Sequence, residues 1–472
     1  MASDDFQQMI GPLKRAAIDA FMCSDSLGDL FGFQIDGDKY IHVQTGGGSA
    51  TSPGLVLVKE VTRPGTDGEG GGDSKTRIPM CPDNDEPGKY ADDFATIRNR
   101  IDEAIERWTW LPDPGAVTPL VESMRQANRV LSLDTVSAEG AVTGGGQIGG
   151  NIALIMESSD AMAGGMITAF KTKFLSQLGK AVAGQHAITV ILGGVLAAEE
   201  KIWEGAQQTV TDLIENTTAA FNAAAEGGSV DWEVALKVVG YAAAAASIFA
   251  TGGAATALKV GAVGLSILTD NVPTEGDPTT APKADYDGVM STFEEVLDGL
   301  ATEIVNEEQI LEDNLVTNLR QIQADRASFD LAAPPLIDID DGSDLGAPSE
   351  LIIEPIRVRE ITETYLPTIA GELKVAVVHL NQADSLSALH RDASIGLGSY
   401  GPNACYHALR NLLEELLENL QARIIYSAKA LQLGAEDIGN ADTKVRDALE
   451  KHADQVRDHG IYPVPQPVGP WL

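Results

Sequence analysis

The chain has 472 residues, with 33 Lys and Arg against 69 Asp and Glu, and a formal net charge of -36. So acidic a surface repels phosphate backbones, and no basic stripe interrupts it, which argues against nucleic-acid binding. Hydrophobic residues make up 44%, enough to form real cores and too many for a disordered acidic tail. The acidity fits either adaptation to salt or a requirement for solubility.

The start of the chain and its cysteines restrict how it could be exported or cross-linked. Residues 1–10 are polar and acidic, without the basic and apolar regions of a cleaved signal peptide. The three cysteines, Cys23, Cys81 and Cys405, are odd in number and far apart. This spacing matches neither a disulfide framework nor a zinc site, so three unconnected thiols are expected.

Residues 1–90 predict a small mixed α/β piece. The expected elements are a helix over 6–22, two strands within 31–44 and a third strand over 55–61. The dipeptide Asp36-Gly37 should form the tight turn between the first two strands, because it accepts positive φ angles. Residues 62–75 are rich in glycine and charge, and are expected to be a loop or linker that does not pack.

Residues 91–331 predict a bundle of long helices, because apolar residues recur there at steps of three and four. The expected helices cover residues 94–110, 117–131, 152–225 (as one helix or two) and 293–329. The glycine pairs Gly164-Gly165 and Gly193-Gly194 are candidate bends in the third of these segments. The fold class is therefore mainly α: an elongated bundle with long amphipathic helices.

The most apolar stretch is residues 234–268, which Thr251-Gly252-Gly253 splits into two arms. Each arm is short for a bilayer span of about 20 residues. Its many small residues allow close helix approach in a protein core or in lipid. A buried hairpin and a membrane-active hairpin are the two alternatives.

The C-terminal part predicts a Pro- and Asp-rich linker over 332–355, a helical hairpin over 356–460 and a Pro-rich tail over 461–472. The hairpin arms should cover residues 366–389 and 404–452, with a glycine-rich turn between them. Leucines on both sides of the arms exceed what one partner helix can cover. The hairpin must therefore pack within the chain, on a helical protein partner, or on a second copy.

Motifs for chemistry are weak throughout. The glycines Gly144, Gly146 and Gly149 have dinucleotide-binding spacing, but no alternating strands and helices surround them. The acidic run from Asp338 to Asp344 misses the calcium-loop pattern. Because the sequence has no HExxH, GxSxG, P-loop or CxxC motif, we expect a non-enzymatic protein without metal or cofactor.

The predicted hairpin resembles the helix-turn-helix proteins of actinobacterial type VII secretion, the WXG100 or ESAT-6-like superfamily. The family joins its arms with Trp-x-Gly. Here Gly398 and Gly401 lie in the turn, but Ser399 replaces the Trp. The family's export signal is Tyr-x-x-x-Asp/Glu, and here Ile438 and Asp442 have the corresponding spacing without the Tyr. A literal Trp-x-Gly occurs at Trp203 and Gly205, within a segment that reads as continuous helix.

The resemblance implies a secretion-associated structural or interaction protein, located outside the cell or in the envelope without a cleaved signal peptide. Its expected partner is another helical protein or a second copy. Two alternatives remain: an α-helical membrane-active protein that inserts residues 234–268, and a cytoplasmic helical scaffold.

Overall fold

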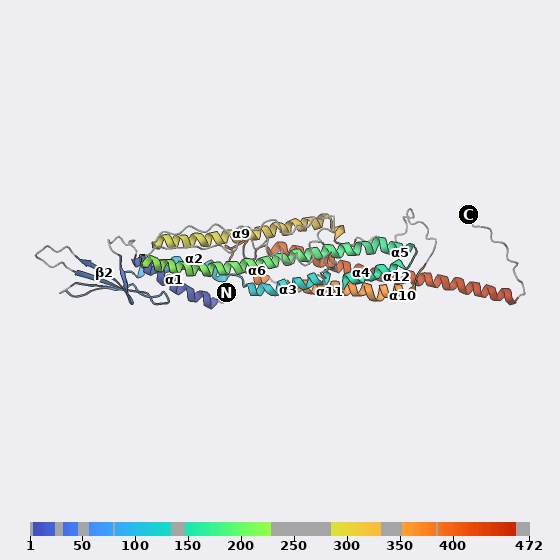
Figure 1. The fold of residues 1–472 in the computed structure, drawn as a ribbon, viewed down its shortest axis with the longest axis horizontal. Coiled ribbons are helices and arrows are strands. Elements are labelled where there is room, and N and C mark those ends of the chain that lie inside the picture. The colour runs from blue at the N-terminus through green and yellow to red at the C-terminus, as the bar shows by residue number, and fades with distance from the viewer. Residues whose placement is uncertain are drawn as a thin grey trace, which may run out of the picture.

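A computed structural model describes residues 3–23, 32–45, 56–78, 81–133, 147–227, 285–331, 352–383 and 386–458. These residues are mainly helical, with one small antiparallel sheet near the N-terminus, as the sequence predicts. Figure 1 shows the sheet at one end and the long helices running away from it along a common direction.

The sheet has five antiparallel strands in chain order. They are β1 (Gln34–Asp36), β2 (Lys39–Thr45), β3 (Val56–Thr62), β4 (Ser74–Arg77) and β5 (Asn84–Glu86). The predicted first turn is confirmed: Gly37 adopts a φ of 58°, which joins β1 to β2. Strands β4 and β5 were not expected, since their short polar sequences show no apolar alternation.

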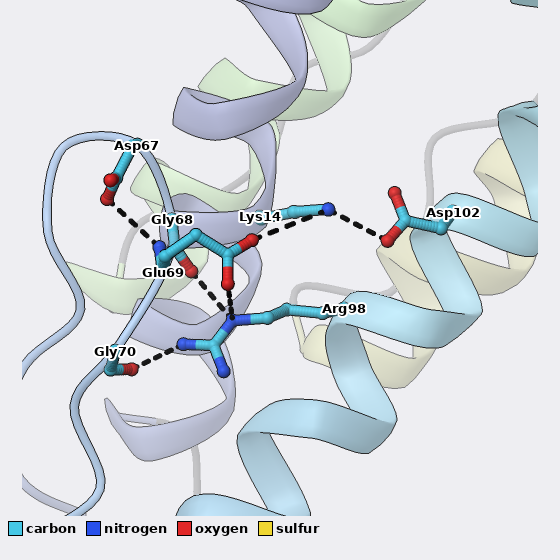
Figure 2. A network of polar contacts seen from close by, with 7 residues as sticks. All are labelled: Lys14, Asp67, Gly68, Glu69, Gly70, Arg98 and Asp102. Carbon is cyan, nitrogen blue, oxygen red and sulfur yellow. Dashed lines mark hydrogen bonds and ion pairs between the residues drawn. The ribbon is translucent and has the colours of Figure 1, made fainter.

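The expectation that residues 62–75 form an unpacked linker is wrong. The segment ends in β4, and its glycine-rich part lies against α1 (Ser3–Cys23) and α2 (Ala91–Ile105), as Figure 2 shows. The Arg98 guanidinium of α2 donates to the backbone oxygens of Gly68 and Gly70. Lys14 of α1 lies 2.8 Å from Asp102 and 3.8 Å from Glu69. Positive φ angles at glycines allow this close path, and they place the backbone oxygens that accept from Arg98.

A buried carboxylate attaches the sheet to α1. Asp19 accepts hydrogen bonds from the Arg63 guanidinium, at the end of β3, and from the Tyr40 hydroxyl of β2, which is 2.7 Å away. Burial, followed by the nearby Asp19 charge, raises the pKa of the Tyr40 hydroxyl, so it stays a donor. The same two causes raise the pKa of the Cys23 thiol to about 11.

The remaining helices form a bundle. They are α3 (Pro114–Leu131), α4 (Ile148–Asp160), α5 (Gly165–Ala169), α6 (Ser176–Ala225), α9 (Tyr286–Ala324), α10 (Pro355–Glu360), α11 (Leu366–Gln382) and α12 (Asn403–Asp458). Turns of 3-10 helix cover Glu106–Trp110, Arg326–Ser328 and Leu386–Leu389, and π-helical turns cover Phe170–Leu175 and Ile361–Tyr365. The predicted first hairpin arm is too long, because α11 ends at Gln382 rather than Leu389.

Helix α6 is the central element, in contact with α1, α3, α9 and α12. From Ala181 to Glu199 almost every residue is buried. The predicted bend at Gly164 is confirmed, since a φ of 135° breaks the helix there, whereas Gly193 and Gly194 lie within the uninterrupted helix α6. The helix over residues 165–225 is long and apolar enough to cross a membrane. However, 94% of its apolar 18-residue stretch is buried inside the protein, as in the core helix of a bundle.

Helices α11 and α12 pack against each other, α11 also contacts α3 and α4, and α12 also contacts α6 and α9. One continuous apolar core joins these helices to α1, which lies in the predicted N-terminal piece. The predicted apolar arms at 234–268, the acidic run from Asp338 to Asp344 and the tail at 461–472 lie outside the described residues.

Candidate functional site

Trp203 and Gly205 lie in the interior of α6, and both are buried. Trp203 and Gly205 therefore form no inter-helix turn, and the continuous helix that the sequence predicts at this Trp-x-Gly is confirmed. Backbone hydrogen bonding continues through the motif, so its glycine is not needed for a turn. The Trp203 side chain instead takes part in a buried polar cluster.

The predicted turn glycines do lie between α11 and α12, and both have positive φ angles: 83° at Gly398 and 57° at Gly401. Their surroundings differ. A Cβ atom on Gly398 would meet nothing within 4 Å, whereas one on Gly401 would lie 2.6 Å from Arg391 and 3.1 Å from Glu308. Position 401 thus requires glycine for two reasons: its backbone has a positive φ angle, and charged side chains lie where a Cβ atom would be.

The structure brings Trp203 and Gly401 together around Arg391. The Arg391 guanidinium lies over the Trp203 ring, 4.5 Å from its centroid, in a cation–π arrangement. The indole nitrogen of Trp203 donates to Glu199, one turn earlier in α6, at 2.9 Å. Together with Glu308 of α9, these side chains form what we call the buried charge cluster: Glu199, Trp203, Glu308 and Arg391.

Glu308 receives the direct ion pair. The Arg391 guanidinium donates to one carboxylate oxygen, and the Leu397 amide donates to the other at 2.6 Å. Both charged side chains have no solvent exposure. Burial and the nearby Glu199 charge raise the pKa of Glu308, while Arg391 and the Leu397 amide lower it.

Glu199 is less well satisfied than Glu308. Its side chain is fully buried, and one carboxylate oxygen has no hydrogen-bond partner among the described residues. Burial raises the pKa of Glu199, while the charge of Arg391 and the Trp203 hydrogen bond lower it. A buried carboxylate with a single donor favours its neutral form.

The buried charge cluster is built to hold parts of the chain together. It lies away from solvent, and it joins α6, α9 and the turn that precedes α12. Arg391 extends the network by donating to the backbone oxygens of Leu389 and Ile395. No group of His, Cys, Asp and Glu among the described residues could hold a metal ion.

Sequence reasoning identified Trp203, Gly398 and Gly401 but missed Glu199, Glu308 and Arg391. A faint signal exists for the two glutamates, since each interrupts the apolar positions of a long helix. Arg391 gives no such signal, because it lies in an irregular segment. Its partner Glu308 is 83 positions away, and only the folded chain brings them together.

Ile438 and Asp442 both lie within α12. The last buried residue of α12 in the described set is Leu431. Figure 1 shows that α12 continues past the other helices and ends alone, at the end of the molecule away from the sheet. The residues with export-signal spacing therefore lie on a helix that leaves the bundle.

The opposite end of the bundle carries the two attachment points of the apolar segment. Phe221, near the end of α6, stacks on Tyr286 at the start of α9, with ring centroids 5.9 Å apart. Phe21 of α1 contacts the same tyrosine ring edge-on at 5.7 Å. The chain thus leaves α6 and enters α9 at one place, beside α1 and the sheet (Figure 1).

Comparison with known proteins gives no relatives: no family model matches the chain, and no curated protein or solved structure resembles it significantly.

Proposed function

We propose that this chain is a non-enzymatic interaction protein associated with a type VII-like secretion system. In this proposal it is an elongated bundle exported by that system, and α11 and α12 are its helical hairpin. The observation that supports the proposal is the projection of α12, the helix that contains Ile438 and Asp442, past the other described helices.

The leucines of the hairpin are already covered, although Val375 and Val378 of α11 are exposed. The leucines Leu373, Leu409, Leu416 and Leu420 are fully buried against the chain's own helices. A partner that bound between the arms would have to displace α3, α6 or α9. Binding at the projecting part of α12 requires no such displacement.

The region where α12 leaves the bundle is apolar and exposed. Ile425, Tyr426 and Leu433 are each more than half exposed, at 55%, 59% and 51%. A helix of this kind gains most of its stability from packing. A helical partner would cover these side chains and extend along the projecting part.

The test is export from an actinobacterial host with an active type VII system. Asp442→Ala should reduce the amount of protein in the medium, and Ile438→Tyr, which restores the family's tyrosine, should increase it. Asp437→Ala is the matched control, because Asp437 is an exposed carboxylate on the same helix outside the signal spacing. Equal export of all variants would contradict the proposal.

A membrane-active protein is the second candidate. The observation that favours it is the shared attachment point of the apolar segment: α6 ends and α9 begins at one end of the bundle. A segment held at both ends in one place can reach a bilayer without opening the helices that carry it. In this hypothesis residues 234–268 insert into lipid.

Dye release from liposomes tests this candidate. The chain should release dye, and Ile248→Asp should abolish release because a charge in the bilayer centre is costly. Ile310→Asp is the control, since Ile310 is an exposed apolar residue on α9. Release that is absent, or equally sensitive to both substitutions, would eliminate the second candidate and leave the first untouched.

A further inference from the structure

We propose that the buried charge cluster is a proton-binding clamp, which holds the turn before α12 against α6 and α9 when protonated and loosens when the proton leaves. The inference concerns a regulatory device and is independent of the proposed function. It rests on the count of charges in the cluster and on their contacts.

The cluster contains two carboxyl groups and a single cation. Arg391 can balance one carboxylate, and it is committed to Glu308 by a direct ion pair in a site without solvent exposure. If Glu199 were also ionised, a net negative charge would be buried, which is costly in a medium of low dielectric constant. One bound proton makes the cluster neutral.

The geometry points to Glu199 as the residue that carries the proton. Glu308 accepts from a guanidinium and a backbone amide, two donors that favour a carboxylate. Glu199 accepts only the indole hydrogen bond, and its second oxygen is unpartnered among the described residues. The charge of Arg391, from the turn, acts on both carboxyl groups, and the charge of Glu199, from the facing helix, acts on Glu308.

Loss of the proton should loosen the turn rather than α6 or α9. The two glutamates lie within long helices whose backbone hydrogen bonds do not depend on them. The turn is held by Arg391, by the Leu397 amide and by a backbone hydrogen bond from Arg391 to Ser399 at 3.1 Å. A negative charge on Glu199 repels the Glu308 carboxylate and competes with it for Arg391. This competition weakens the contacts that position the turn.

The direction of the pH effect follows from proton linkage. The folded cluster keeps a proton at pH values where a glutamate in the unfolded chain has lost it, so folding takes up a proton in that range. The resulting stabilisation is complete below the ordinary glutamate pKa. It is lost as the pH rises through the higher pKa of the folded cluster. Acid therefore tightens the turn and alkali loosens it.

The experiment is hydrogen exchange of peptides from residues 386–402, read by mass spectrometry between pH 5 and 9 and corrected for intrinsic rates. We expect protection of this turn to fall by up to about tenfold per pH unit as the single proton is lost. Peptides from α3 should not show this fall. If protection of the turn in the wild-type protein did not change with pH, the inference would be overturned by this measurement alone.

Substitution then identifies the cluster as the cause. Glu199→Gln keeps an acceptor for Trp203 and cannot ionise, so its turn should stay protected at pH 9. Glu295→Gln, an exposed glutamate on α9, is the control and should retain the wild-type profile. Glu308→Gln should lower protection at every pH, because it removes the partner of Arg391. A wild-type profile in Glu199→Gln would contradict the assignment.

Discussion

Alanine at Gly401 tests whether the buried charge cluster fixes the turn before α12. Gly398 provides a matched control three positions earlier, because both glycines have positive φ angles. Each substitution costs about 1–2 kcal/mol for placing an L-residue in the left-handed region. Only Gly401 adds a steric conflict, with a Cβ atom 2.6 Å from Arg391.

The conflict at Gly401 cannot be relieved cheaply. A guanidinium usually moves aside, but this one is fully buried, bonded to Glu308 and stacked on Trp203. Breaking a buried ion pair costs about 3–5 kcal/mol. If half of that cost is incurred, Gly401→Ala should be less stable than Gly398→Ala by about 2 kcal/mol, or roughly 30-fold in the unfolding equilibrium constant.

Urea denaturation followed by circular dichroism at 222 nm measures this difference. The midpoint should fall slightly for Gly398→Ala and much further for Gly401→Ala. Equal shifts would show that only backbone conformation matters at this turn. The role that we assign to Arg391 would then be refuted.

Three further predictions concern other polar side chains. Asp19→Asn should cost about 2–3 kcal/mol, seen as faster hydrogen exchange in β2 and β3 but not in α6, while the exposed Asp36→Asn should not change it. Burial lowers the pKa of His186 to about 4, so its contribution to stability is complete above the ordinary histidine pKa and is lost as the pH falls toward 4. His186→Gln should remove that acid-side loss, whereas His379→Gln, at a half-buried site, should retain it. Arg98→Ala should make residues 63–73 a site of rapid proteolysis, since it removes the donors to Gly68 and Gly70; Arg129→Ala, at an exposed site, should not.

The helices could be predicted from sequence because their apolar periodicity is a local property. The helix at 117–131 and the long helix containing Phe293 follow directly from apolar residues at steps of three and four. The β-hairpin formed by β1 and β2 could also be predicted from sequence, since Asp36-Gly37 specifies a tight turn. These features need no information about distant residues.

The missed features depend on contacts between distant residues. Strand β4 is polar and short, and it forms because β3 offers a partner edge. The glycine-rich loop packs because Arg98, 30 residues beyond Gly68, reaches its carbonyl oxygens. The buried charge cluster joins three segments, so no single stretch of sequence contains its pattern. Trp203 stands out in the sequence only as part of a Trp-x-Gly motif, which lies inside α6, whereas its place in the cluster depends on Arg391.

The proposed function is tested most directly by following the full-length protein in a host with and without its type VII motor ATPase. We predict that the protein appears in the medium or envelope of the strain that has the ATPase and is absent there in the strain that lacks it. In the strain that has the ATPase, Asp442→Ala should be exported in a smaller amount than the wild type. Equal retention of the protein inside both strains would contradict a role in secretion.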